Sequence, residues 1–175
     1  GANAGFNPAG DFMGDGVMSV NINMNLETAA LPVFRLMGMA IPICLSREAD
    51  DMELAWERWH ESSLKDTLPA FSKSVYVLRH LYHSTGYILI IGYLVSNDAP
   101  LPEGACEWYV APQVYQVATL PEASRHAAAA AWQQLATLPD RRFEADFESY
   151  PSHSASKIYV GITGDVAMAE ETLDD

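Results

Sequence analysis

The segment Met52-Glu-Leu-Ala-Trp-Glu-Arg-Trp59 decides how the first half of the chain folds, and a later segment repeats its pattern. Its apolar residues stand three and four positions apart, which is the period of one face of an α-helix. The segment Ala128-Ala-Ala-Ala-Trp-Gln-Gln-Leu135 has the same spacing 76 residues later, and its Trp132 corresponds to Trp56. This coincidence predicts an internal duplication, with one amphipathic helix in each half.

The first helix is expected to have one strand before it and two strands after it. Asp50 and Glu53 have the spacing of a capping box, so we expect the helix to begin at Asp50 and to end before Leu68-Pro69. Strand-forming residues gather in three runs around it, at residues 33–43, 74–82 and 87–95. The first unit is therefore predicted to run strand, helix, strand, strand.

A second unit with the same order follows a linker rich in Asn, Asp, Pro and Gly at residues 96–105. Its strands and helix are expected at residues 108–119 (strand), 124–138 (helix), 145–150 and 157–163 (strands). Two units of this size are too small to bury their helices separately, so they should share one core. The predicted organisation is a flexible N-terminal arm (1–25), a single domain (26–166, with repeats at about 31–96 and 105–164) and an acidic C-terminal tail (167–175).

Composition argues against two classes of protein. The chain has 23 Asp and Glu against 10 Lys and Arg, and its net charge of −13 repels phosphate backbones, so direct nucleic-acid binding is not expected. Each apolar run is shorter than the roughly 18–20 residues of a membrane span, so no membrane insertion is expected. Because no secretion signal is visible, we expect a cytoplasmic protein. Cys44 and Cys106 are expected to be buried free thiols, with a disulfide between them as the alternative.

Four fragments of the sequence resemble a known family. In chain order they are Pro32-Val-Phe-Arg-Leu-Met-Gly38, Ala111-Pro-Gln-Val-Tyr-Gln-Val117, Trp132 followed by Leu138-Pro139, and Phe147-Glu-Ser-Tyr150. With this order and spacing, the chain resembles the GyrI-like family, the bacterial effector-binding domains that are attached to AraC-type and MerR-type transcription regulators and that also stand alone. Since no helix-turn-helix accompanies these fragments, we expect the stand-alone form.

The resemblance implies a fold class and an architecture. The fold expected is α+β and SOUL-like, with tandem strand-helix-strand-strand units related by a pseudo-twofold. The sheets should be antiparallel, and a ligand channel should lie between the two repeats.

The strand that ends at Tyr150 supplies the expected ligand anchor. Alternation places Phe143, Ala145 and Phe147 on one face, which we expect to pack against the helices, and puts the acidic residues on the other. Those acidic residues fit a solvated face equally well, but the resemblance implies that Glu148 faces the channel. A desolvated carboxylate beside aromatic rings attracts lipophilic cations.

Aromatic residues complete the expected site. We expect five ligand-binding residues. The tyrosines are chosen because they match positions in the family, and Trp59 is chosen because it lies at the edge of its helix. The five are Glu148, Tyr150, Tyr115, Tyr93 and Trp59. Trp56 and Trp132 lie in the middle of their helical stripes and are expected to pack against the sheet. Tyr159 either reaches the channel or lies at the surface. The histidines and cysteines have no metal-ligand spacing and no phosphate-binding glycine motif is present, so we expect neither a metal nor a cofactor.

Three functions fit these features. The first is the capture of hydrophobic, cationic or aromatic small molecules with Glu148 as the anchor, as in multidrug binding, and it requires no reaction. The second is the hydrolysis of strained electrophilic compounds, in which Glu148 would act as the base. The third is a protein-interaction role, such as inhibition of DNA gyrase, carried by the acidic surface. The sequence favours the first and leaves the other two open.

Overall fold

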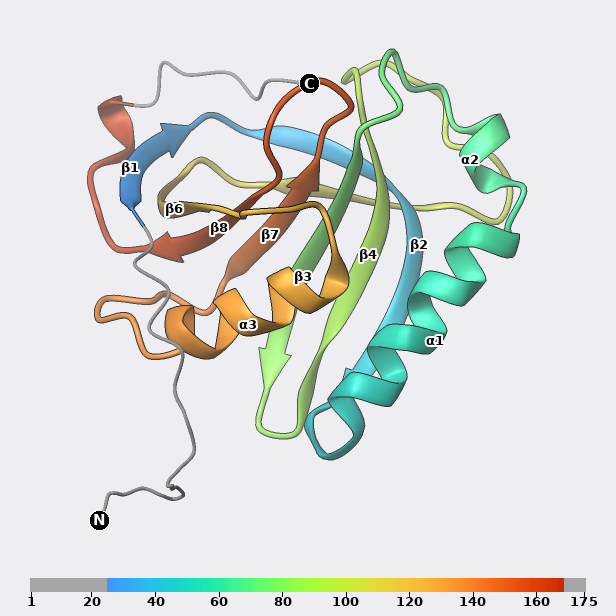
Figure 1. Ribbon diagram of the computed structural model, residues 1–175. Helices are drawn as coiled ribbons and strands as arrows, with labels where there is room; N and C mark the ends of the chain where they lie inside the picture. Colours follow the sequence, from blue (N-terminus) through green and yellow to red (C-terminus); the bar gives the residue numbers. More distant parts are fainter. Residues whose placement is uncertain (1–24, 169–175) are drawn as a thin grey trace.

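The computed structural model describes residues 25–168, which form an α+β structure around one curved antiparallel sheet (Figure 1). The elements in chain order, with η for a 3-10 helix, are β1 (Leu26–Leu31), β2 (Phe34–Cys44), η1 (Leu45–Arg47), α1 (Glu48–Glu61), α2 (Leu64–Thr67), β3 (Val75–His83), β4 (Gly86–Val95), β5 (Cys106–Val110), β6 (Gln113–Thr119), α3 (Arg125–Leu135), β7 (Ala145–Tyr150), β8 (Lys157–Ile162) and η2 (Val166–Met168). The predicted N-terminal arm and acidic C-terminal tail lie almost wholly outside the described residues.

The sheet consists of two similar halves joined at β3 and β7. Its strand order is β1-β6-β8-β7-β3-β4-β2-β5. In the first unit β4 lies between β2 and β3, and in the second β8 lies between β6 and β7, so the order of each unit is the mirror of the other across the β3–β7 junction. The predicted tandem repeat of strand-helix-strand-strand units is confirmed. All eight strands share this sheet, and the domain boundaries stay predictions.

The strand that precedes each unit in the chain pairs with a strand of the other unit. The single strand expected at residues 108–119 is in fact two strands, because Ala111 and Pro112 separate β5 from β6. Proline has no amide hydrogen to donate to a sheet, so it favours a break at this point. β5, which precedes the second unit, pairs with β2 of the first, whereas β1, which precedes the first unit, pairs with β6 of the second. β1 was not anticipated as a strand.

Two short connections force the sheet to curl. Pro32 and Val33 alone join β1, at one end of the strand order, to β2 near the other end, and Ala111 and Pro112 alone join β5 to β6 in the same way. Three Cα steps reach at most roughly 11 Å. The two ends of the sheet therefore come together, as the long arc of β2 in Figure 1 shows. The curl encloses a core on the face that carries no helix, with Tyr76, Tyr115 and Phe147 among its buried side chains.

A pair of glycines permits the close approach of β2 and β4 in this arc. Gly38 lies opposite Gly92 in the register of the two strands. A Cβ atom on Gly38 would lie 1.9 Å from the carbonyl oxygen of Ile91, and one on Gly92 would lie 1.9 Å from that of Met37. Any side chain at these positions would collide with the backbone of the partner strand.

The helices cover the other face of the sheet. Ala55, Trp56 and Trp59 of α1 are buried against β2 and β4, which confirms the predicted stripe. The predicted capping box is wrong: α1 begins at Glu48, two residues earlier, and its first residues include three acidic side chains that favour a helix N-terminus. In α3, by contrast, the Ser124 hydroxyl caps the helix by accepting a hydrogen bond from the amide of Ala127 at 3.0 Å.

The two cysteines are free, as expected, but they are not both buried. Cys44 is half-buried and Cys106 is exposed on the edge strand β5. Among residues 25–168, no helix is long and apolar enough to cross a membrane.

A buried histidine makes the stability of this fold depend on pH. His80 on β3 is 2% exposed, its ring lies 4.4 Å from that of Trp108, and neither ring nitrogen has a hydrogen-bond partner. Burial lowers the pKa of His80 from 6.5 to about 4. Between these two values the unfolded chain binds the proton and the folded chain does not, so the stability gained from neutral His80 is full above pH 6.5 and is lost as the pH falls toward 4.

We expect the free energy of unfolding to fall by roughly 1 kcal/mol more between pH 7.5 and 5.5 in the wild type than in His80→Leu, because the variant has no imidazole to protonate. Urea unfolding at the two pH values measures the difference. The exposed His153 supplies the control, since His153→Gln should keep the wild-type dependence. Equal pH dependence in the wild type and His80→Leu would show that His80 titrates normally in the folded chain.

Candidate functional site

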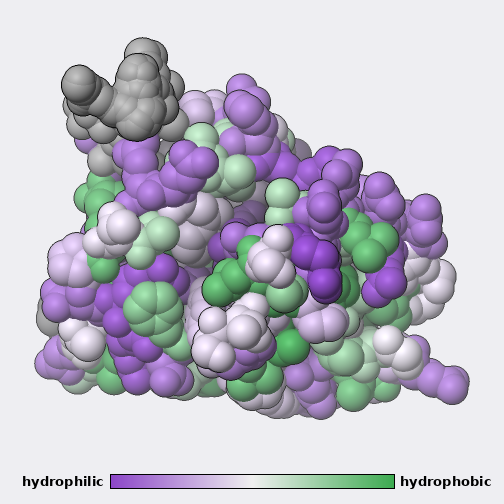
Figure 2. Space-filling model, turned by 90° about the horizontal axis from the view of Figure 1, so that it is seen from below, coloured by the Kyte–Doolittle hydropathy of each residue, from purple (hydrophilic) through white to green (hydrophobic). Residues whose placement is uncertain are grey.

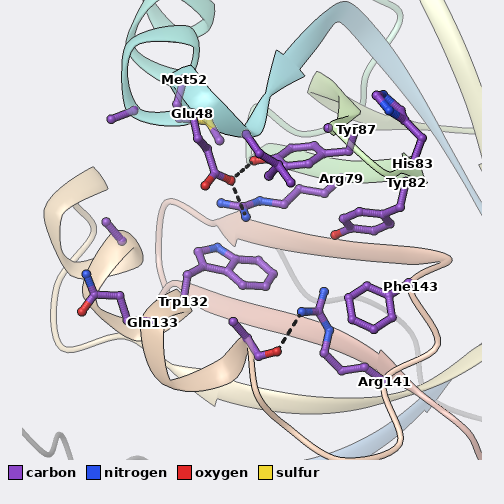
Figure 3. Close-up of a pocket in the computed structure, with 15 residues that line it drawn as sticks. Glu48, Met52, Arg79, Tyr82, His83, Tyr87, Trp132, Gln133, Arg141 and Phe143 are labelled. Carbon is purple, nitrogen blue, oxygen red and sulfur yellow. Dashed lines mark hydrogen bonds and ion pairs between the residues drawn. The ribbon is translucent and has the colours of Figure 1, made fainter.

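A cleft of about 860 Å³ opens between α1 and α3, so each repeat contributes one wall (Figure 3). The residues that line it are Leu45, Glu48, Ala49 and Met52 from η1 and α1, Arg79, Tyr82, His83, Gly86 and Tyr87 from β3 and β4, Ala129, Trp132, Gln133 and Ala136 from α3 and the residue after it, and Arg141 and Phe143 from the α3–β7 loop. The cleft is therefore a feature of the junction between the repeats and belongs to neither one alone.

A bulge in β3 brings two cleft residues onto the same side of the strand. Arg79 and Tyr82 are three positions apart and would point to opposite faces of a regular strand. The pairing with β4 shifts between His80 and His83, and Leu81 adopts a left-handed conformation with φ of 51°. The extra residue turns Tyr82 toward the helices, beside Arg79.

The guanidinium of Arg79 forms the floor of the cleft. Its central carbon lies 4.0 Å from the ring centre of Trp132 and 5.2 Å from that of Tyr87, both in cation–π geometry. Its terminal nitrogens form ion pairs with Glu148 and Glu48, each at 3.5 Å. Burial lowers the pKa of Arg79, but Glu148, Tyr87, Tyr82 and Glu48 together raise it above the ordinary value, so the side chain stays charged.

Glu148 lies beneath Arg79 and is only 4% exposed. The indole Nε1 of Trp132 donates a hydrogen bond to its Oε2 at 2.8 Å, and the Tyr150 hydroxyl donates to its Oε1 at 2.5 Å. Burial and the adjacent Glu148 raise the pKa of Tyr150, so this hydroxyl keeps its proton and remains a donor. A buried carboxylate is thus held by two neutral donors and one cation.

Asp146 makes a second buried ion pair two residues before Glu148, on the same face of β7. The Arg141 guanidinium donates to its Oδ2 at 2.7 Å, the Tyr82 hydroxyl donates to the same oxygen at 2.5 Å, and the amide of Gly161 donates to Oδ1 at 2.7 Å. Arg141 also lies 4.1 Å from the ring centre of Phe143. These contacts fix the α3–β7 loop, which forms one side of the cleft mouth.

The chain matches no known family profile and no curated protein, but it does match solved structures. SAV2435 bound to tetraphenylphosphonium superposes with a TM-score of 0.69 and 14% identity, over 81% of this chain and 95% of that one. A protein of Staphylococcus aureus MU50 assigned to bacterial transcription regulation gives 0.66 and 13%, over 81% and 99%. An integron cassette protein from the mobile metagenome of Vibrio cholerae gives 0.62 and 20%, over 79% and 95%.

The chain has a GyrI-like fold. At these identities the likeness extends to the fold alone. In this GyrI-like fold the cleft described above lies at the junction between the repeats, where the resemblance implied a channel.

The structure brings together two of the five predicted ligand-binding residues. Glu148 and Tyr150 share a hydrogen bond below the cleft. Tyr93 and Trp59 are buried against each other in the core under α1, and Tyr115 is buried in the core on the opposite face of the sheet. None of the five lines the cleft itself: Glu148 lies beneath Arg79, and Tyr150 lines a second hollow described below.

The expectation that Phe147 faces the helices is wrong, whereas Phe143 precedes β7 and lines the cleft. Phe147 points away from the helices and stacks on Tyr159, with ring centres 4.3 Å apart, while its neighbours Asp146 and Glu148 point toward the helices. The curled sheet has a core on each face, so an apolar side chain on β7 can be buried on either face. Tyr159, whose position was left open, packs in the core on the face without helices.

Sequence reasoning missed several residues of the cleft. Trp132 was assigned to packing, and it does pack in the core under α3, but it also lines the cleft and binds Glu148. Arg79 carried a usable signal, because it follows Val75 and Val77 on one face of a predicted strand. A single charge that continues an apolar face indicates a buried ion pair, although its partners were not predictable.

A second hollow of about 530 Å³ lies on the far side of Glu148. Its lining residues are Trp56, His60, Val75, Ala123, Ser124, Arg125, His126 and Tyr150. Since Tyr150 and Trp132 both donate to Glu148, this carboxylate stands between the hollow and the cleft. The described residues contain no group of three or more metal-ligating side chains at either place.

We expect Asp146→Asn to lower the free energy of unfolding by about 3–5 kcal/mol, because it leaves the buried Arg141 without its counter-charge. Arg47→Gln breaks the exposed pair between Arg47 and Asp51 and should cost about 0.5 kcal/mol or less. Denaturant unfolding of the two variants checks the contrast. Similar small losses in both variants would show that the buried pair contributes little to stability.

Proposed function

We propose that the chain binds hydrophobic small molecules, in particular cationic or aromatic ones, in the cleft between α1 and α3, with Glu148 as the charged anchor. The observation that carries this proposal is a buried carboxylate directly beneath Arg79, which forms the floor of a cleft lined with aromatic rings from both repeats; one of these rings, Trp132, donates a hydrogen bond to the carboxylate. The neighbour of the same fold that was solved with bound tetraphenylphosphonium supports the ligand class. The proposal requires no chemical reaction.

The size and charge of the cleft support this ligand class. A volume of about 860 Å³ falls within the roughly 300–1,000 Å³ of typical drug-sized sites. When the buried partners of the two lining arginines are counted, three carboxylates (Glu48, Asp146 and Glu148) and two guanidinium groups (Arg79 and Arg141) leave one negative charge in excess at and beneath the cleft. The net charge of −13 adds a long-range attraction for cations.

The surface around the cleft suits a ligand that is apolar in its body and charged at one point. Figure 2 shows the molecule from the side on which the β3–β4 turn lies in Figure 1, and hydrophobic and hydrophilic side chains are mixed over this face. Inside the cleft the rings of Trp132, Tyr82, Tyr87 and Phe143 provide faces for stacking. Such faces accept ligands of many shapes, since stacking needs no fixed donor pattern.

A hydrolytic role for Glu148 receives less support from its contacts. Its two oxygens already accept hydrogen bonds from Trp132 and Tyr150 and pair with Arg79. A general base must be within hydrogen-bond reach of the water that it activates.

The two free cysteines fit a reducing compartment, and we infer a cytoplasmic location on that basis.

Thermal unfolding with tetraphenylphosphonium tests the proposal. At a ligand concentration of about 100 times Kd, we expect the Tm of the wild type to rise by roughly 5–10 °C. Neutral triphenylphosphine oxide, which has similar rings but no charge, should give a smaller rise. Glu148→Gln should lose most of the shift for the cation, because the anchor is no longer charged.

The ligand-induced shift, and not the Tm itself, is the quantity to compare, because Glu148→Gln also removes the partner of Arg79. Glu107→Gln is the matched control, since Glu107 pairs with Arg35 at a site outside the cleft. It should keep the wild-type shift. No shift of the wild type with either compound would contradict the proposed function.

A further inference from the structure

The cation-binding position at the base of the cleft is already filled by a side chain of the protein. Arg79 lies against Trp132 at 4.0 Å and pairs with Glu148 at 3.5 Å, and these are the contacts that an aromatic cation would make there. Figure 3 shows Arg79 extended across the cleft toward Glu48, above Trp132. A ligand cation that is to reach Glu148 must therefore compete with Arg79.

Arg79 is held less closely than the other buried arginines. Arg35 and Arg141 each approach a carboxylate oxygen to 2.7 Å, and Arg35 also donates to three backbone carbonyl groups. Arg79 forms one hydrogen bond to Glu148, at 3.5 Å, and its Nε, like that of Arg141, has no partner. Charge and ring faces hold this guanidinium in place, with little help from short, directed hydrogen bonds.

The cleft also offers Arg79 a second position. Its Nη1 already lies 3.5 Å from Oε2 of Glu48, which is on the α1 wall and has a side chain that is 39% exposed. The Tyr87 hydroxyl donates to the same oxygen at 2.5 Å and so orients the Glu48 carboxylate toward the cleft. A small rotation of the Arg79 side chain would exchange Glu148 for Glu48 and water, and the guanidinium would not be left unpaired.

We propose that Arg79 is the specificity-determining residue of this cleft, an internal cation that a ligand must displace from Glu148 and Trp132 toward Glu48. This inference rests on the proposed function. The competition selects against small, strongly hydrated cations, which gain too little from Trp132 to replace a guanidinium. It favours large cations with delocalised charge and several rings. Displacing Arg79 costs free energy, and this cost lowers the observed affinity for any cation. The same loss occurs in any protein whose binding-competent conformation is only a small fraction of the free protein.

Titration calorimetry with tetraphenylphosphonium tests the inference. We expect R79M to bind this cation at least about tenfold more tightly than the wild type, because the competitor is absent and Glu148 is free. In the double variant R79M/E148Q the gain should disappear, since the released carboxylate is also gone. An equal or weaker affinity of R79M, with the wild type binding and E148Q impaired, would overturn the role of Arg79 and leave the proposed function intact.

The double variant also controls for folding. R79M leaves Glu148 buried without its cation, whereas R79M/E148Q replaces the pair with two uncharged side chains, an exchange that proteins often tolerate. Near-ultraviolet circular dichroism shows whether each variant keeps its packed core. Binding by neither the wild type nor R79M would overturn the proposed function, and the inference with it.

A measurement on the wild type itself follows Arg79 directly and uses a variant only to assign one signal. The guanidinium carbon of Arg79 lies 4.0 Å from the ring centre of Trp132, so the NMR signal of the adjoining Nε–H group should be shifted by the ring current. Comparison with the spectrum of R79M/E148Q assigns this signal. On saturation with tetraphenylphosphonium, it should move toward the position of an exposed arginine. A signal that stays in place while the ligand binds would overturn the displacement.

Discussion

Two buried carboxylates on one strand determine how the helix-covered side of this protein is built. Asp146 and Glu148 alternate with the core residue Phe147 on β7, so both must point toward the helices. A buried carboxylate is costly without a cation and directed donors. Arg141 and Arg79 supply the cations, and the space that these long side chains need is not filled by apolar packing. The cleft follows from this requirement.

The curled sheet explains why the cleft lies between the repeats. Its outer ends meet, so the face without helices closes on a core of its own, and α1 and α3 each cover a separate core on the other face. The two helix-covered cores leave a gap above the β3–β7 junction, where the polar side chains of β7 emerge. Because each repeat places its helix over its own half of the sheet, neither helix covers the junction between the two halves.

Local pattern was sufficient for most elements, and it failed where distant strands decide the outcome. The stripe through Trp56 and the cap at Ser124 depend on neighbours in sequence, and both were predictable. The side to which Phe147 points depends on the curl, which comes from links between strands far apart in the order. Glu148 was singled out by resemblance, whereas Arg79 was missed because its partners lie on α1, α3 and β7.

Because β1 pairs with β6 and β5 pairs with β2, neither half of the sheet can be completed before strands of the second unit have been synthesised. Leu26 of β1 pairs with Ala118, so β1, the first strand of residues 25–168, waits after its synthesis for a partner made 92 residues later. At 5–20 residues per second this wait lasts roughly 5–20 seconds. Within that time, from the synthesis of β2 until that of β5, the amino-terminal half exposes the edge of β2 that β5 later covers. Nascent-chain chaperones therefore have a defined interval in which this edge needs protection.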